Sequence, residues 1–146
     1  ENVIGIAGFG AAAEAAARDL AAGVWEEVAE IRNILISALD PADQATIFVG
    51  QSGARLPNTV CIATPGWKAE TQVMQMDLAG FAISAGSACS SGKVRASRVL
   101  TASGLGAEVA ASAVRVSIGP GVTREEVLRF ADVWRRARDR HRARAA

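Results

Sequence analysis

The sequence predicts an α+β domain in which helices pack on a small, mostly antiparallel sheet. A long proline-free stretch near the N-terminus spaces its apolar residues as a helix does. The centre and last third of the chain carry short β-branched segments bounded by turn-forming residues. A second amphipathic helical pattern lies near the C-terminus. Helical and strand patterns therefore intermix within one length of chain, which is typical of helices layered on a sheet.

Residues 4–39 are expected to form two helices or one bent helix. Apolar residues recur there at spacings of three or four, at Leu20, Val24, Val28, Ile31 and Leu35. Several glycines, the last at Gly23, weaken the first part, and Asp40-Pro41 ends the stretch. We therefore divide the chain into a linking helical region, residues 1–40, and a small domain, residues 41–146.

The small domain is expected to alternate short strands and helices. Its predicted strands are residues 46–49, 60–64, 81–84 and 114–118, and its predicted helices are residues 69–78, 97–103 and a last helix from Thr123. Thr123 and Glu126 have the spacing of a capping box. The last helix carries an apolar stripe made by Val127, Phe130, Ala131 and Trp134. From Arg135 this stripe gives way to arginines, so we expect a solvated basic tail.

The composition limits the classes of protein to which the chain can belong. A chain of 146 residues that is 50% hydrophobic and has a net charge of +1 has the composition of one folded domain, which excludes a wholly disordered chain. Its two cysteines are too few for a disulfide scaffold and lack zinc-ligand spacing, so we expect a cytoplasmic protein without a metal site. No apolar run reaches membrane-spanning length, and no aromatic platform accompanies the basic tail. Neither a membrane nor a nucleic acid is an expected partner.

The most informative segment is residues 84–92, which read Ser-Ala-Gly-Ser-Ala-Cys-Ser-Ser-Gly. Side chains this small cannot form a core, so Cys89 is expected to be accessible. Lys93, Arg95 and Arg98 follow closely and favour the thiolate, which is the nucleophilic form of cysteine. From the residues alone, two interpretations stay open: a nucleophilic cysteine, or a surface turn that contains an incidental one.

Three motifs occur along the chain in this order: RLPNT, then SAGSACSSGKV followed by SRVL, then AVRVSIG. Together they closely resemble the C-terminal region of cysteine desulfurases, pyridoxal-phosphate enzymes of aminotransferase class V that take sulfur from L-cysteine. The opening ENVIGIAGFGAAAEAA is also similar to a family segment. The resemblance implies the small C-terminal domain of a pyridoxal-phosphate-dependent transferase, preceded by a long linking helix.

The resemblance also implies two site residues. Cys89 matches the family's catalytic cysteine, which takes the sulfur of the substrate as a persulfide and leaves L-alanine. Arg115 matches the arginine that binds the substrate carboxylate, for which a planar guanidinium is well suited. A solvated arginine at a strand edge is the alternative for Arg115. The family resemblance further implies a homodimer and a sulfur-acceptor or iron-sulfur scaffold protein as partner.

The sequence departs from the family at the cofactor site. In the family, pyridoxal phosphate is bound by a lysine that follows a histidine in the large N-terminal domain. This chain contains only Lys68 and Lys93, and neither follows its one histidine, His141. We therefore expect that the cofactor domain is absent, that no residue here binds the cofactor and that these residues alone are inactive.

Other functions and residues stay open. The alternatives to a desulfurase are a non-catalytic persulfide carrier or interaction module that uses Cys89 alone, and a selenocysteine lyase-type enzyme. Asn58 fits a turn, which asparagine favours, and a ligand contact equally well, and it is not expected to be catalytic. Cys61, in an apolar strand, is expected to be a buried, inert thiol. His141 is expected to be a solvated surface residue.

Overall fold

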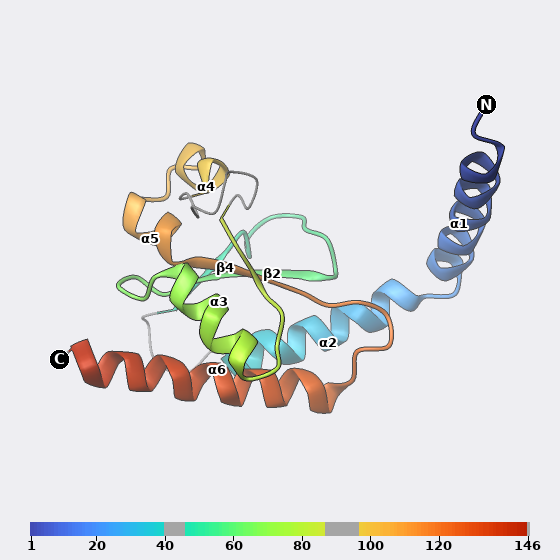
Figure 1. The fold of residues 1–146 in the computed structure, drawn as a ribbon. Helices are drawn as coiled ribbons and strands as arrows, with labels where there is room; N and C mark the ends of the chain where they lie inside the picture. The colour runs from blue at the N-terminus through green and yellow to red at the C-terminus, as the bar shows by residue number, and fades with distance from the viewer. Residues whose placement is uncertain (40–45, 87–96, 146) are drawn as a thin grey trace.

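The computed structural model describes residues 1–39, 46–86 and 97–145. Its elements, in chain order, are α1 (Val3–Ala21), α2 (Val24–Leu39), β1 (Ile47–Val49), β2 (Thr59–Ala63), α3 (Ala69–Leu78), β3 (Ser84–Ala85), α4 (Arg98–Ala102), α5 (Ala107–Ser112), β4 (Ala113–Ser117) and α6 (Arg124–Ala145). Figure 1 shows the sheet lying between the long helix α6 and the short helices α4 and α5. The predicted α+β fold is confirmed.

The strands form one antiparallel sheet of four strands in the order β1-β2-β4-β3. The central pair is β2 and β4, which match Cys61 with Arg115 and Val60 with Val116. Side chains alternate between the two faces of a strand. Val60, Ile62, Val114 and Val116 therefore face one side of the sheet, and Cys61 and Arg115 face the other.

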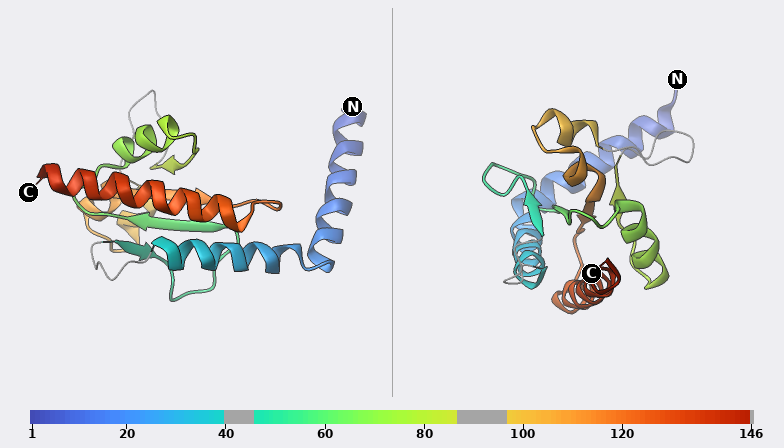
Figure 2. Two further views of the ribbon diagram at one scale, coloured as in Figure 1. Left: turned by 90° about the horizontal axis from the view of Figure 1, so that it is seen from below. Right: turned by 90° about the vertical axis from the view of Figure 1, so that its left-hand side faces the viewer.

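Helices α2, α3 and α6 cover the first of these faces, as the end-on view in Figure 2 shows. The apolar side chains of β2 and β4 pack there against Leu35 of α2, Met76 of α3 and Phe130 of α6, all of them buried. Among the described residues, the opposite face is covered at one end only, where α4 and α5 place Leu100 and Ala110 against Ala63 and Ala113. The rest of that face carries the side chain of Arg115, which is exposed.

A polar network lies inside the covered layer. Trp67 and Trp134 are fully buried, with ring centroids 5.5 Å apart. The Gln72 amide donates to the carbonyls of Trp67 (2.9 Å) and Ser112 (2.8 Å) and accepts from the Trp134 indole N–H (3.2 Å). Gln72 thus ties α3 to α6 and to the end of α5, and a buried amide is tolerated because its hydrogen bonds are made.

The N-terminal stretch forms two helices, one of the two arrangements expected. Helix α1 ends at Ala21, and Gly23 has a φ of +79°, a conformation that glycine adopts without steric cost. α1 extends away from the sheet and buries none of its residues (Figure 1). Of the predicted apolar face, Val28 and Leu35 are buried, whereas Leu20 is exposed. No described helix is long and apolar enough to cross a membrane.

Two predicted elements differ from the structure. The strand expected at residues 81–84 is only Ser84–Ala85, because the Phe81 N–H bonds back to the Met76 carbonyl (2.8 Å) at the end of α3. The chain reaches the sheet only after that turn. Helix α5 was not predicted, because its alanine-rich sequence has no apolar stripe. The capping box is confirmed: the Thr123 N–H donates to the Glu126 carboxylate (2.8 Å), and the Glu126 N–H donates to Thr123 Oγ1 (3.3 Å).

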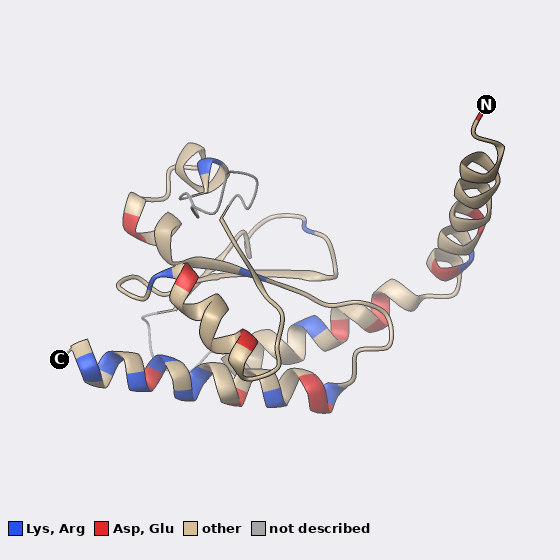
Figure 3. Ribbon diagram, in the orientation of Figure 1, with Lys and Arg blue, Asp and Glu red and all other residues tan. Residues whose placement is uncertain are grey.

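The basic tail is not simply solvated, so that prediction was wrong. Helix α6 continues to Ala145, and both Ala137 and Arg138 are buried. His141 stacks on Trp67 with ring centroids 5.7 Å apart, and its Nε2 lies 3.1 Å from the Gly66 carbonyl. The buried positions follow Trp134 at helical spacing, so the packed face persists among the arginines that colour this half of α6 in Figure 3.

Candidate functional site

The candidate site is built on a row of three residues across the uncovered sheet face. Arg115 on β4 pairs with Cys61 on β2 at one side and with Ser84 on β3 at the other. Cross-strand neighbours such as these have Cβ atoms about 5 Å apart. The Arg115 guanidinium reaches Ser84 Oγ at 3.5 Å, a long contact that leaves its other donors available. The row therefore presents a guanidinium between a thiol and a hydroxyl.

Strand alternation is what brings Arg115 to this face. Val114 and Val116 on either side of it are buried against the helical layer, so Arg115 must point the other way. Its charged group consequently stays in contact with solvent and avoids the cost of burying an unpaired charge. The prediction of a strand around Arg115 is confirmed, but its role in binding remains a prediction.

Two hollows flank Arg115. One, of about 330 Å³, lies between β3, β4 and α4 and includes Ser84, Gly86, Ser97 and Arg98 in its wall. The other, of about 490 Å³, lies toward the segment after β1 and includes Arg55 and Thr59. The described walls of the two hollows hold three arginines and no acidic residue. Such a surface favours an anionic ligand, and a carboxylate fits a guanidinium in two-point contact.

Sequence reasoning did not assign Arg55 and Ser84 to this site. Arg55 begins the RLPNT motif and Ser84 begins the SAGSACSSGKV motif, but neither was given a role. They join Arg115 only through strand pairing and the fold of the segment after β1. Arg98 was expected to favour the thiolate of Cys89 from its place in the sequence. The structure adds that Arg98 lines the same hollow as Arg115.

Cys61 lies on the site face and not in the core as expected. It is half-buried and lines both hollows. Desolvation by burial raises the pKa of the Cys61 thiol, and the nearby Arg115 opposes that rise with a smaller effect. Cys61 is thereby kept as a thiol, the weakly nucleophilic form. Its expected inertness is compatible with this environment, although its expected full burial was wrong.

Cys89 and Lys93 lie outside the described residues, as do residues 87–88, 90–92 and 94–96 of the small-residue segment. The two described residues that border this segment are Gly86 and Ser97, and both line the hollow beside Arg115. The segment therefore leaves the described part of the fold and rejoins it at the same hollow.

The described residues do not fit the role of a pyridoxal-phosphate site. Lys68 is exposed and precedes α3, in the loop that leads to the covered face. No lysine is found in the described walls of the two hollows beside Arg115. His141 stacks on Trp67 and not beside Arg115. Asn58 lies in the turn before β2, one of the two places left open for it, and its carbonyl accepts the Ile118 N–H (2.8 Å).

Comparisons with known proteins support the motifs found in the sequence. The family described as aminotransferase class-V matches residues 1–130. A cysteine desulfurase from Frankia sp. is 41% identical over 139 residues, covering 93% of this chain and 32% of the relative. A cysteine desulfurase IscS from Dictyoglomus turgidum is 32% identical over 136 residues, covering 93% of this chain and 34% of the relative. The chain thus spans about a third of the length of these relatives.

The solved structures that align with this chain are NifS-like proteins. A NifS-like protein from Rickettsia africae aligns with a TM-score of 0.81 at 28% identity, over 95% of this chain and 35% of that one. A second NifS-like protein aligns with a TM-score of 0.78 at 24% identity, which supports the fold alone. Sequence motifs, family match and fold agree, and the chain belongs to the aminotransferase class-V family.

Proposed function

We propose that this chain is the sulfur-accepting part of a cysteine desulfurase, in which Arg115 binds the carboxylate of L-cysteine and Cys89 takes its sulfur. The observation that carries the proposal is the shared hollow. The exposed guanidinium of Arg115 and both borders of the segment that holds Cys89 line one cavity of about 330 Å³. A substrate held by its carboxylate at Arg115 would present its sulfur to that segment.

The short stretch of chain between Gly86 and Cys89 supports this arrangement. Cys89 is three residues from Gly86, and a fully extended chain spans at most about 3.6 Å per residue, so the two lie within about 11 Å. Gly86 itself lines the hollow beside Arg115. Cys89 is therefore tied to the neighbourhood of the substrate arginine by covalent geometry alone. Glycine, alanine and serine at positions 85–92 offer no bulky side chain that would hinder its approach.

The proposed chemistry is nucleophilic transfer of sulfur. The Cys89 thiolate forms a bond to the sulfur of L-cysteine as the Cβ–S bond of the substrate breaks. The electron pair of the broken bond takes up a proton, which yields L-alanine, and Cys89 is left as a persulfide. Arg98 and Arg115, both in the wall of the hollow, favour the thiolate form over the neutral thiol.

Pyridoxal phosphate enters the proposal as the group that labilises the Cβ–S bond in this class of enzyme. Since neither Lys68 nor His141 lies at the hollow, the described residues do not supply its attachment site. We propose that the residues holding it belong to polypeptide beyond these 146 residues, and that this chain alone does not release sulfur from L-cysteine. A homodimer and a sulfur-acceptor or iron-sulfur scaffold protein complete the proposed assembly.

The test uses the complete protein in which these residues are joined to the cofactor-binding part. Cys89→Ser is expected to lower sulfur release at least about a hundredfold, equivalent to about 2.7 kcal/mol in the barrier. Mass spectrometry of the unsubstituted protein after reaction with L-cysteine should place the persulfide on Cys89, and it should still do so in a Cys61→Ala variant. A persulfide found on Cys61 instead would reject Cys89 as the acceptor.

The carboxylate role of Arg115 has its own test. Arg115→Lys keeps the charge but loses the two-point contact, so KM for L-cysteine should rise about tenfold or more with a smaller change in kcat. The matched control is Arg140→Lys, an exposed arginine on α6 far along the chain from the hollow. If Arg115→Lys leaves KM unchanged, Arg115 is the solvated strand-edge residue that the alternative describes.

A further inference from the structure

The hollow of about 490 Å³ beside Arg115 contains a second arginine, Arg55. Arg55 lies in the segment between β1 and β2 and is half-buried. The hydroxyl residues Thr59 and Ser117 also line this hollow. They pair across β2 and β4, two residues along from the pair of Cys61 with Arg115, so all four lie on the same face of the sheet. One wall of the hollow is therefore polar sheet face, and Arg55 adds a second guanidinium to it.

A hydrogen bond from α2 fixes the segment that carries Arg55. The Arg32 guanidinium donates to the carbonyl of Leu56 (3.1 Å) and to Oδ1 of Asn33 (3.0 Å). Burial and the nearby charge of Arg55 lower the pKa of the Arg32 guanidinium. Arg55 is thus held next to a like charge, with its neighbour in the chain tied to a helix.

No carboxylate of the described residues balances this charge. Arg55 makes no salt bridge to an acidic residue in the described part of the chain. The described wall of the hollow contains Arg55 and Arg115 and no acidic side chain. A half-buried guanidinium beside another cation costs free energy that an approaching anion offsets. The arrangement therefore favours an anion in this hollow.

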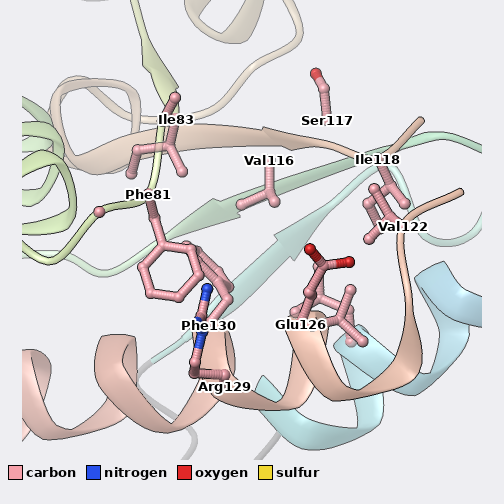
Figure 4. A pocket seen from close by; sticks show the side chains of 13 residues that line it. Phe81, Ile83, Val116, Ser117, Ile118, Val122, Glu126, Arg129 and Phe130 are labelled. Carbon is pink, nitrogen blue, oxygen red and sulfur yellow. The ribbon is translucent and has the colours of Figure 1, made fainter.

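The cavity on the covered side of the sheet differs in its charge. It has a volume of about 240 Å³, and Glu126 and Arg129 both belong to its mainly apolar wall (Figure 4). Arg129 is close enough to the Glu126 carboxylate to favour its charged form. The two charges oppose each other there, so that cavity does not select an anion. The hollow beside Arg115 has no such counter-charge among its described residues.

We propose that Arg55 is a specificity-determining residue that attracts the substrate carboxylate by charge, while Arg115 binds it by hydrogen bonds. This role rests on the proposed function, in which the carboxylate of L-cysteine lies at Arg115. Because Arg115 lines both hollows, an anion at its guanidinium faces the charge of Arg55 whichever hollow holds the rest of the substrate. The attraction is stronger in a partly buried hollow than in bulk water, since the effective dielectric constant is lower there.

Two cations at one site select amino acids that have a free α-carboxylate. L-Cysteinamide, and a cysteine at the N-terminus of a peptide, carry a neutral amide in place of that carboxylate. Either would lose the attraction to both guanidiniums, while its ammonium group would still be repelled by them. Arg115 alone already discriminates against such amides, and Arg55 increases the discrimination. The site therefore favours free L-cysteine over cysteine whose carboxyl group is in amide linkage.

The test measures the binding of L-alanine and L-alaninamide to the complete protein, in which these residues are joined to the cofactor-binding part. The two ligands differ only in the carboxyl group, and neither contains sulfur, so their binding does not depend on Cys89. In isothermal titration calorimetry, Arg55→Gln should weaken L-alanine about fivefold and change L-alaninamide less than about twofold. Arg115→Gln also removes hydrogen bonds and should weaken L-alanine about tenfold or more.

Two matched variants and a change of salt distinguish charge from contact. Arg55→Lys keeps the charge and should retain the affinity for L-alanine to within about twofold, unlike Arg115→Lys. Arg140→Gln removes an exposed charge on α6 and should leave both affinities within about twofold. In about 1 M salt the screening length is about 3 Å. The effect of Arg55→Gln should then fall below about twofold, whereas most of the effect of Arg115→Gln should persist.

Four results would overturn the role of Arg55, and they separate it from the proposed function. If Arg115→Gln weakens L-alanine and Arg55→Gln does not, the carboxylate site stands without Arg55. A lower melting temperature of Arg55→Gln with unchanged binding would pair Arg55 with an acidic group elsewhere in the protein. Equal losses in Arg55→Lys and Arg55→Gln would reject an effect of charge. If neither Arg55→Gln nor Arg115→Gln changes the preference for L-alanine over L-alaninamide, the proposed binding of the carboxylate at Arg115 fails as well.

Discussion

The two faces of the sheet are formed by the same strands but lie in opposite environments. One face buries Val60, Ile62, Val114 and Val116 beneath α2, α3 and α6. On the other face Arg115 is exposed beside a half-buried Cys61, and of the described elements only α4 and α5 cover one end. Because successive residues of a strand alternate between faces, a single five-residue strand, β4, contributes to both the core and the candidate site.

The difference between the two faces shows that the covered face supplies most of the free energy of folding. Apolar burial on the covered face contributes about 25 cal/mol per Å² removed from water, whereas an exposed guanidinium contributes little. The face that carries Arg115 can therefore keep a positive charge with no carboxylate partner among the described residues, and two open hollows, because the other face supplies the stability. Substitutions on the two faces should differ accordingly.

The largest expected effect is the loss of Trp134 from the covered face. Trp134→Ala removes a fully buried ring and leaves Gln72 without its indole donor. The free energy of unfolding should fall by about 4 kcal/mol, as for other buried aromatic truncations. Urea unfolding followed by far-UV circular dichroism measures this change, with the smaller truncation Trp134→Phe as the control. A loss below about 1 kcal/mol would contradict a tightly packed layer.

A buried hydrogen-bond network gives the next largest effect. Gln72→Leu keeps most of the volume but leaves the Trp134 indole and the carbonyls of Trp67 and Ser112 without their partner. Each buried unsatisfied group costs about 1–3 kcal/mol, part of which relaxation recovers, so we expect a loss of about 3 kcal/mol. Gln51→Leu, at an exposed position, is the control in the same unfolding measurement. Equal losses in the two variants would remove the network as the cause.

Most of the covered face could be predicted from the sequence, because its elements carry strong periodic signals. The stripe Val127, Phe130 and Trp134 identified α6, and the Thr123 to Glu126 spacing identified its start. The extent of the packed tail could not be predicted. Arg138 and His141 look solvated in the sequence, and their positions become clear only when Trp67, from a distant loop, is placed against α6.

A pH-dependent effect is expected at the capping box that begins α6. Hydrogen bonds from Thr123 to the Glu126 carboxylate lower its pKa in the folded state. A lowered pKa means that the carboxylate stabilises the fold above its unfolded-state pKa and that this stabilisation is lost as pH falls through the folded-state value. Glu126→Gln should therefore lower the melting temperature near neutral pH, and the difference should vanish in acid.

The control for this prediction is Glu125→Gln, the exposed neighbour in the same first turn. Both carboxylates interact with the helix dipole, but only Glu126 accepts the described hydrogen bonds from Thr123. Thermal unfolding between neutral and strongly acidic pH should therefore show the steeper pH dependence for Glu126→Gln. Parallel curves for the two variants would assign the effect to the dipole alone.

The candidate site could be predicted only in part from the sequence, because its arrangement depends on how the strands pair. The strand around Arg115 was predicted from its alternation, and family motifs pointed to Arg115 and Cys89. That Cys61 and Ser84 flank Arg115 depends on strand register, which pairs residues far apart in the chain. A single sequence holds no local signal for that register, so the placement of Cys61 in the core was the natural but wrong expectation.

The smallest expected effect on stability is at Arg115 itself, and it is the sharpest test of the contrast between the faces. Arg115 is exposed, and its only described hydrogen bond is the 3.5 Å contact to Ser84, so Arg115→Gln should change the free energy of unfolding by less than about 0.5 kcal/mol. Its neighbour Val114 is buried on the other face, and Val114→Ala should cost about 2 kcal/mol. Urea unfolding of both variants gives the comparison directly. If Arg115→Gln proves as costly as Val114→Ala, the uncovered face also stabilises the fold, and Arg115 has a structural role that its exposure does not reveal.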